Sequence, residues 1–244
     1  LFIDWSPDCD GLALLKQMNF SAEIQGCWDM SGIPTQFYID NGGFEGGDAE
    51  YWYSAVRYFK PARIIEIGSG NSTLVARQAI ARNCKDDPAY VCEHTCIEPY
   101  HVPWLEETGV RVLRNRVEDV DRALFSTLCH NDILFIDSSH VIRPQGDVIT
   151  EFLQILPRLA AGVVVHVHDI FSPRDYSSAA VIRDVWFWNE QYLLEAFLTH
   201  NRDWRVIGAL NYLKHHQYSS LKTLCPYLAE SKEPGSFYMQ RCVD

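Results

Sequence analysis

The stretch Arg63-Ile64-Ile65-Glu66-Ile67-Gly68-Ser69-Gly70-Asn71-Ser72-Thr73 decides which fold this chain is expected to adopt. Its first five residues are rich in β-branched side chains and predict a short buried strand. The two glycines allow the backbone to turn sharply, and residues 72–81 then follow a helical pattern. A strand that ends in a glycine turn and leads into a helix is typical of the ligand-binding edge of an open α/β sheet.

Strand-like and helix-like segments alternate along the rest of the chain. A helix is expected over 48–59, ahead of the glycine turn, and others over 117–128, 147–159 and 185–200. Further strands are expected over 90–97, 110–113, 133–136, 162–167, 204–207 and 236–241. This alternation predicts a doubly wound α/β domain over 48–244, with a parallel sheet covered on both faces. Residues 1–47 are expected to form an irregular N-terminal arm or cap with one short helix over 12–18.

The composition excludes several classes of partner. The 244 residues include 21 Lys plus Arg and 32 Asp plus Glu, so the formal charge is −11. A chain this acidic is a poor binder of phosphate backbones, and we expect no nucleic-acid partner. The longest apolar stretches, such as 160–167, are too short to span a bilayer. We therefore expect no membrane association, and the lack of a disulfide scaffold favours a reducing, cytoplasmic setting.

The cysteines are expected to be free. The chain has eight, which is too low a density for a disulfide scaffold, and no Cys-x-x-Cys pair occurs. Cys84, Cys92 and Cys96 lie close enough in the sequence to suggest a metal site. However, Cys92 and Cys96 flank an apolar step into a strand, where free cysteine is commonly a small core residue.

Two acidic residues are placed to bind a ligand at the glycine turn. Glu66 precedes the first glycine by two residues and is placed to accept hydrogen bonds from a cationic or amine-bearing group. Glu98 ends the next strand, where a carboxylate can accept both hydroxyls of a ribose. The N–H groups at the start of the following helix are unpaired, and Ser72 or Thr73 is available as its cap. A dinucleotide fingerprint requires a third glycine at position 73, so an NAD-dependent oxidoreductase is only the alternative interpretation.

These motifs resemble the class I S-adenosylmethionine-dependent methyltransferases. The resemblance narrows to the methyltransferase family 24 type through four blocks: Phe44 to Asp48-Ala49-Glu50, Ile136-Asp137-Ser138-Ser139-His140-Val141, His166-Val167-His168-Asp169-Ile170-Phe171 and Asn189-Glu190-Gln191-Tyr192. It covers roughly residues 44–242. It implies a Rossmann-like methyltransferase sheet with an antiparallel C-terminal strand, and S-adenosylmethionine as the methyl donor.

The resemblance also assigns residues to the donor. Glu66, Gly68 and Gly70 would hold the methionine part, within a cofactor-binding set that also includes Ser69, Ser72 and Thr73. Glu98 would hold the ribose. Glu118 lies where such enzymes often contact the adenine, and Asp137 ends the fourth strand beside the donor.

Four polar residues are expected to meet beside the donor's methyl group. Asp137 and His140 follow the fourth predicted strand, and His168 and Asp169 end the fifth. Neighbouring parallel strands end side by side, so these side chains should form one cluster. Carboxylates and imidazoles can bind a divalent metal, or a histidine can serve as general base toward an acceptor hydroxyl. The cluster is similar to that of the catechol-type metal-dependent O-methyltransferases, which have an acid after the fourth strand and Asp-Asn after the fifth. Asp137 and Asp169 match this pattern, but position 170 is Ile where those enzymes have Asn.

The predicted activity is methyl transfer to an oxygen of a small, natural-product-like molecule. Asp137, His140, His168 and Asp169 are the candidate catalytic residues and the candidate metal ligands. Tyr176, Asn189 and Gln191 follow the fifth strand and are the candidate acceptor-binding residues. A non-catalytic binding module with the same fold is a further alternative, which the intact polar set disfavours.

Overall fold

A seven-stranded sheet forms the centre of the molecule. The computed structural model describes residues 11–29 and 32–242. The strand order is β3-β2-β1-β4-β5-β7-β6, and β7 runs antiparallel to both of its neighbours. The strands are β1 (Arg63–Ile67), β2 (Glu93–Ile97), β3 (Arg111–Leu113), β4 (Ile133–Ile136), β5 (Val164–Val167), β6 (Trp204–Ala209) and β7 (Phe237–Arg241). The predicted Rossmann-like methyltransferase sheet, with its antiparallel C-terminal strand, is confirmed.

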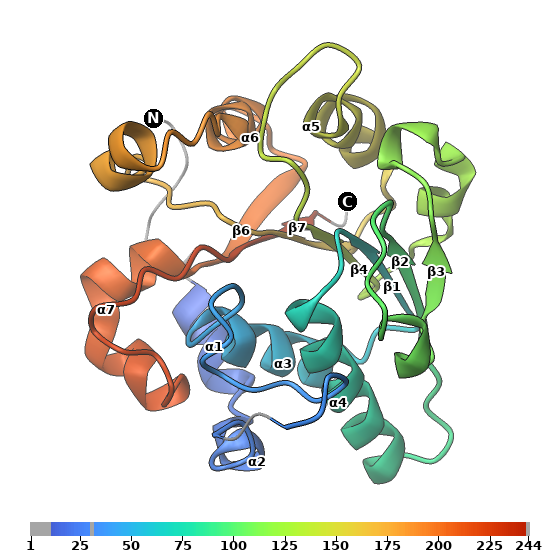
Figure 1. Cartoon of the computed structure of the whole chain (residues 1–244), viewed down its shortest axis with the longest axis vertical. Coiled ribbons are helices and arrows are strands. Elements are labelled where there is room, and N and C mark those ends of the chain that lie inside the picture. The colour runs from blue at the N-terminus through green and yellow to red at the C-terminus, as the bar shows by residue number, and fades with distance from the viewer. Residues whose placement is uncertain (1–10, 30–31, 243–244) are drawn as a thin grey trace.

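Helices cover both faces of this sheet (Figure 1). The helices are α1 (Gly11–Gln17), α2 (Ser21–Ile24), α3 (Asp48–Phe59), α4 (Asn71–Asp86), α5 (Asp147–Thr150), α6 (Glu190–Leu198) and α7 (Leu210–Leu224). Helices α1, α3, α4 and α7 pack on one face, and α5 and α6 pack on the other. Because side chains alternate along a strand, Ile64 faces the first layer and Ile65 the second.

The described part of the N-terminal segment packs into the main core. Met18, Trp28 and Phe37 are fully buried in the cluster that includes α3 and α4. Glu23 on α2 accepts two hydrogen bonds from the guanidinium of Arg57 on α3, at 2.8 and 2.9 Å. The segment is thus joined to the sheet domain by both apolar and charged contacts. Its role as a cap remains a prediction.

Two predicted helices differ in the structure. The segment 117–128 forms two short 3₁₀ helices, Val117–Asp119 and Arg122–Thr127, in place of one α-helix. The Arg122 guanidinium donates to the carbonyls of Val117 and Glu118 at 3.0 Å. The Arg122 side chain thus bonds to carbonyls that would accept backbone N–H groups if an α-helix continued through this segment.

The helix predicted over 185–200 begins only at Glu190. Val185 has a φ of 54°, which a helix does not accommodate. The backbone N–H groups of Asn189 and Glu190 both donate to the carbonyl of His140, at 2.9 and 3.2 Å. A tertiary contact thus determines where α6 begins. The sequence pattern also missed α7, whose apolar positions are interrupted by a kink at Gln217.

The helices predicted over 12–18, 48–59 and 72–81 are present as α1, α3 and α4, and the helix predicted over 147–159 is present with a change of form. α5 continues into a π-helix, Glu151–Ile155, and then a 3₁₀ turn, Leu156–Arg158. Other short segments are the 3₁₀ turn Glu106–Thr108 and the π-helix Ala179–Arg183. Throughout residues 11–29 and 32–242, no helix has both the length and the apolar character needed to cross a bilayer. The cysteines in these ranges are free.

Candidate active site

The glycine turn packs directly against the end of β4. Gly68 has a φ of 79°, and a Cβ placed there would lie 1.9 Å from the carbonyl oxygen of Asp137. Only glycine allows this approach, because any side chain would collide with the neighbouring backbone. The N–H of Ser69 then donates to Glu98 at 3.1 Å. The turn therefore brings the ends of β1, β2 and β4 together.

Glu66 lies behind the turn and does not line the cavity beside it. Its carboxylate accepts hydrogen bonds from the hydroxyls of Ser72 and Thr73 at the start of α4, and lies 3.0 Å from His94. Glu66 is fully buried. Its position suits it to hold the start of α4 against β1, and its predicted contact with the donor remains a prediction.

A cavity of about 630 Å³ opens at the carboxyl ends of β1, β2 and β4. Of the residues predicted to bind the donor, Gly68, Ser69, Glu98, Glu118 and Asp137 line it. The others, Glu66, Gly70, Ser72 and Thr73, do not. Glu98 accepts backbone N–H groups from Ser69 and Tyr100, and a carboxylate has further lone pairs for a ligand.

The predicted polar cluster forms. The Nε2 atom of His140 lies 3.3 Å from Asp137 and 3.6 Å from Asp169. The Nδ1 atom of His168 lies 3.5 Å from Asp137 and 3.8 Å from Asp169. The two carboxylates therefore face the same pair of imidazoles, on one side of the sheet edge.

Two members of this cluster have unusual backbone conformations. His140 and Asp169 both have a φ of 58°, in the left-handed region that non-glycine residues rarely adopt. Strained positions of this kind are concentrated at functional sites, where the surrounding structure holds them. Here they turn the ends of β4 and β5 so that both side chains reach the cluster.

Sequence reasoning did not foresee the roles of two acids that support the histidines. Glu190 at the start of α6 is fully buried and lies 2.9 Å from Nδ1 of His140. Asp48 at the start of α3 lies 3.8 Å from Nε2 of His168. Glu190 belongs to the Asn-Glu-Gln-Tyr block, so the block itself was the available signal. Asp48 belongs to the block from Phe44 to Asp48-Ala49-Glu50, which likewise was the available signal, although that block did not indicate a contact with His168.

In the absence of a bound cation, the electrostatics of the cluster favour charged imidazoles. Burial opposes a charge on His140, but the bonds to Asp137 and Glu190 outweigh it and raise its pKa to about 10. Burial likewise opposes the charge on His168, yet Asp169 and Asp137 raise its pKa well above the usual value. Burial raises the pKa of Asp137, but the two histidines lower it by more, so that its pKa lies well below its ordinary range. Burial raises the pKa of Asp169.

The donor set fits a divalent cation. Asp137, His168 and Asp169 each offer a ligand atom, and these atoms lie within 4.8 Å of one another. Both ring nitrogens of His168 are buried and have no hydrogen-bond partner. An oxygen and imidazole set suits several divalent metals. His166, in contrast, lies among apolar side chains. Its ring stacks on that of Tyr238 with 4.3 Å between the ring centroids, and burial lowers its pKa.

A second cavity, of about 460 Å³, lies on the other side of the cluster. Asp169 lines it, together with the aromatic side chains of Phe171, Tyr176 and Trp186. Of the predicted acceptor-binding residues, only Tyr176 lines this cavity. The side chain of Asn189 accepts the N–H of Ile142, and Gln191 is bonded to the backbone of the loop that follows β5.

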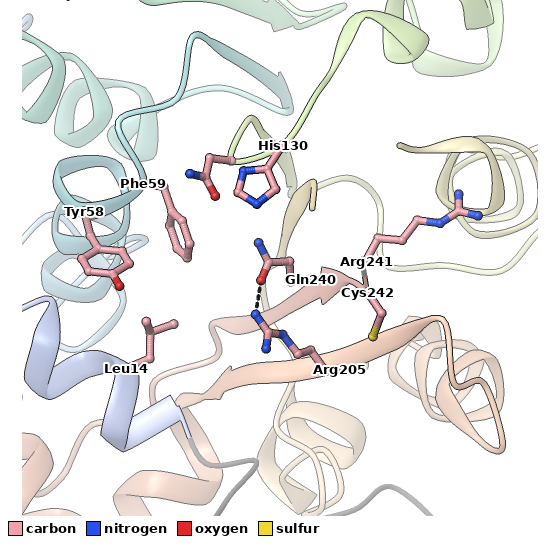
Figure 2. Close-up of a pocket in the computed structure, with 9 residues that line it drawn as sticks. Leu14, Tyr58, Phe59, His130, Arg205, Gln240, Arg241 and Cys242 are labelled. Carbon is pink, nitrogen blue, oxygen red and sulfur yellow. Dashed lines mark hydrogen bonds between the residues drawn. The ribbon is translucent and has the colours of Figure 1, made fainter. Parts of the chain in front are cut away.

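A larger cavity, of about 760 Å³, lies at the opposite edge of the sheet and contains none of the predicted site residues (Figure 2). Arg205 at the start of β6 and Gln240 near the end of β7 are bonded to each other there. This edge carries the amino ends of the parallel strands, where ligands of open α/β sheets do not normally bind.

If Glu98 holds the ribose of the donor as predicted, Glu98→Gln should weaken binding of S-adenosylhomocysteine (SAH), the demethylated donor, by about 10- to 100-fold, because it removes charge-assisted hydrogen bonds to the ribose hydroxyls. Calorimetric titration measures the effect. Glu107→Gln, on an exposed turn between β2 and β3, is the matched control and should bind as the parent does. Parental affinity in Glu98→Gln would contradict the assignment.

The strand order, the glycine turn and the strand-end acid beside one cavity together define the Rossmann-like fold of the class I methyltransferases. Residues 65–170 match the model of methyltransferase family 24, described as a methyltransferase domain. The resemblance read from the sequence is confirmed over this stretch, which runs from β1 to the residue after Asp169.

Three individual proteins show similarity to this chain in part of the sequence or in structure. An uncharacterized protein of Archaeoglobus fulgidus is 36% identical over 103 residues, which are 40% of this chain and 44% of that protein. The O-methyltransferase from Bacillus cereus, solved in complex with SAH, is 14% identical, with a TM-score of 0.47 over 96% of this chain and 90% of that one. The MycE methyltransferase from the mycinamycin biosynthetic pathway, solved with Mg and SAH, is 12% identical, with a TM-score of 0.41 over 79% and 49%.

Proposed function

We propose that the protein is an S-adenosylmethionine-dependent methyltransferase that methylates an oxygen atom of a small molecule. One observation carries this proposal: the polar cluster separates two cavities. Asp137 lines the cavity at the glycine turn, Asp169 lines the aromatic cavity, and both contact the same two histidines. A donor in the first cavity and an acceptor in the second would meet at the cluster.

The donor cavity presents groups suited to each part of S-adenosylmethionine. Glu98 would accept the ribose hydroxyls, and Glu118 would accept a hydrogen bond from the adenine amine. Gly68, which has no side chain, and Ser69, whose side chain is small, leave room for the methionine part. This orientation directs the sulfonium toward Asp137, whose negative charge complements it.

The aromatic cavity suits a small organic acceptor. Phe171, Tyr176 and Trp186 provide apolar walls, and aromatic walls of this kind bind planar or apolar groups. Its lining contains two arginines, Arg174 and Arg183, and four acids, and Arg183 is paired with Asp184 at 2.8 Å. Such a lining does not form the cationic surface that a nucleic-acid acceptor requires.

The transfer itself is an in-line displacement, in which alignment supplies much of the rate. The acceptor oxygen bonds to the methyl carbon while the carbon–sulfur bond breaks, and the electron pair remains on sulfur. A divalent ion held by Asp137, His168 and Asp169 would supply positive charge that makes the acceptor hydroxyl more acidic. His140 orients Asp137, and Glu190 holds His140 in turn. The hydroxyl proton passes to Asp169, the carboxylate on the acceptor side.

The test is calorimetry followed by an activity screen. We expect SAH to bind with one site per chain and NAD not to bind. Methyl transfer to catechol-like hydroxyl compounds should be abolished by a chelator and restored by Mg²⁺. Binding of NAD in place of SAH would contradict the proposed donor. Transfer to RNA but to no small molecule would contradict the proposed acceptor.

A further inference from the structure

Three metal-binding side chains meet behind the glycine turn, between β1 and β2. Glu66 lies opposite Cys96 in the strand register, and His94 projects from the same face of β2. The Oε2 atom of Glu66 lies 3.0 Å from Nε2 of His94 and 3.4 Å from Sγ of Cys96. The nitrogen and sulfur atoms are 3.8 Å apart. We propose that these three residues bind a structural zinc ion.

The separations match the edges of a zinc coordination shell. Zinc bonds sulfur at about 2.3 Å and nitrogen or oxygen at about 2.0–2.2 Å, usually in a tetrahedron. One ion at these distances can reach all three atoms at once. Thiolate, imidazole and carboxylate are also the ligand types that zinc prefers. The fit therefore holds in both chemistry and geometry.

Burial supports an ion that neutralises the site. The side chains of Glu66 and His94 are fully buried, and Cys96 is equally inaccessible. The two positive charges of zinc would balance one thiolate and one carboxylate, which leaves no net charge in the interior. In the absence of a cation, burial and the neighbouring Glu66 hold the pKa of the Cys96 thiol well above its ordinary value.

The surroundings supply both a fourth position and outer support. The hydroxyl of Ser69 is buried without a hydrogen-bond partner and lies next to Cys96. This hydroxyl, or a water bound to it, can complete the tetrahedron. Ser72 and Thr73 donate to the Glu66 carboxylate, as outer groups commonly do for a carboxylate that binds a metal. The ion would thus fasten β1, β2 and the start of α4 together.

This site is distinct from the cluster at the ends of β4 and β5. That cluster contains no sulfur, and Glu66 does not line the donor cavity. The two sites can therefore be separated by variants. Asp169→Asn protein is expected to retain about one zinc per chain after purification without chelators, as elemental analysis measures it. The double variant Asp169→Asn with Cys96→Ser should fall to background.

Cys92→Ser in the same Asp169→Asn background is the matched control, because Cys92 precedes the same strand but lies outside the cluster; it should retain the zinc. Zinc K-edge absorption of the unaltered protein provides a second readout that needs no variant. We expect a sulfur neighbour at about 2.3 Å together with nitrogen or oxygen at about 2.0–2.1 Å. A shell without sulfur, or zinc that survives Cys96→Ser, would overturn the proposal, whatever the outcome for methyl transfer.

Discussion

Asp169→Asn is expected to lower kcat for methyl transfer by about 10²- to 10³-fold, while SAH affinity stays within about twofold of the parent. Asparagine has the same shape and tolerates the left-handed backbone found here, but it removes the charge that faces His140 and His168. Asp169 lines only the acceptor cavity, so donor binding should be spared. Steady-state kinetics and calorimetry measure the two effects separately.

Asp175→Asn is the matched control for this variant. Asp175 lines the same acceptor cavity but bonds to the hydroxyl of Tyr192, away from the cluster. It should alter KM for the acceptor with little change in kcat. Asp137→Asn offers a further contrast, since Asp137 lines the donor cavity and its loss should weaken SAH binding as well. An Asp169→Asn enzyme with kcat within threefold of the parent would contradict the proposed role.

Arg57→Met is expected to lower the free energy of unfolding by about 3–5 kcal/mol. The Arg57 side chain is only 5% exposed and bonds to Glu23, Asn83 and Asp86. Methionine keeps the bulk but removes the two short hydrogen bonds to the Glu23 carboxylate, which is 18% exposed, and leaves it the more distant Arg82 at 3.8 Å. The loss should be largest for the contact between α2 and α3. Chemical denaturation measures it as a lower midpoint.

Arg183→Met provides the comparison on the surface. Arg183 forms an ion pair with Asp184 that is open to solvent, and such pairs contribute about 0–1 kcal/mol. The two variants therefore remove the same charge from environments that differ in burial. Equal destabilisation by both substitutions would contradict the expectation that the buried contacts of Arg57 stabilise the fold more than the exposed pair of Arg183 does.

The sequence alone was sufficient for the features that depend on local order. The strand 63–67 and its glycine turn could be placed because β-branched residues and two glycines are local signals. The cluster of Asp137, His140, His168 and Asp169 could also be predicted. Parallel strands that adjoin each other must end at the same edge, so knowing where the strands end was enough.

Only the tertiary structure decided which groups support that cluster and which cavity each residue faces. Asp48 and Glu190 reach the histidines from helices that are distant in sequence, and no local pattern encodes such contacts. Asn189, a candidate residue for binding the acceptor, accepts the N–H of Ile142 and so also holds the backbone after β4. Glu66 is likewise turned toward His94 and Cys96, because the pairing of β1 with β2 places them on one buried face. The residue types were visible in the sequence, but their partners depended on packing between segments that the chain brings together only when it folds.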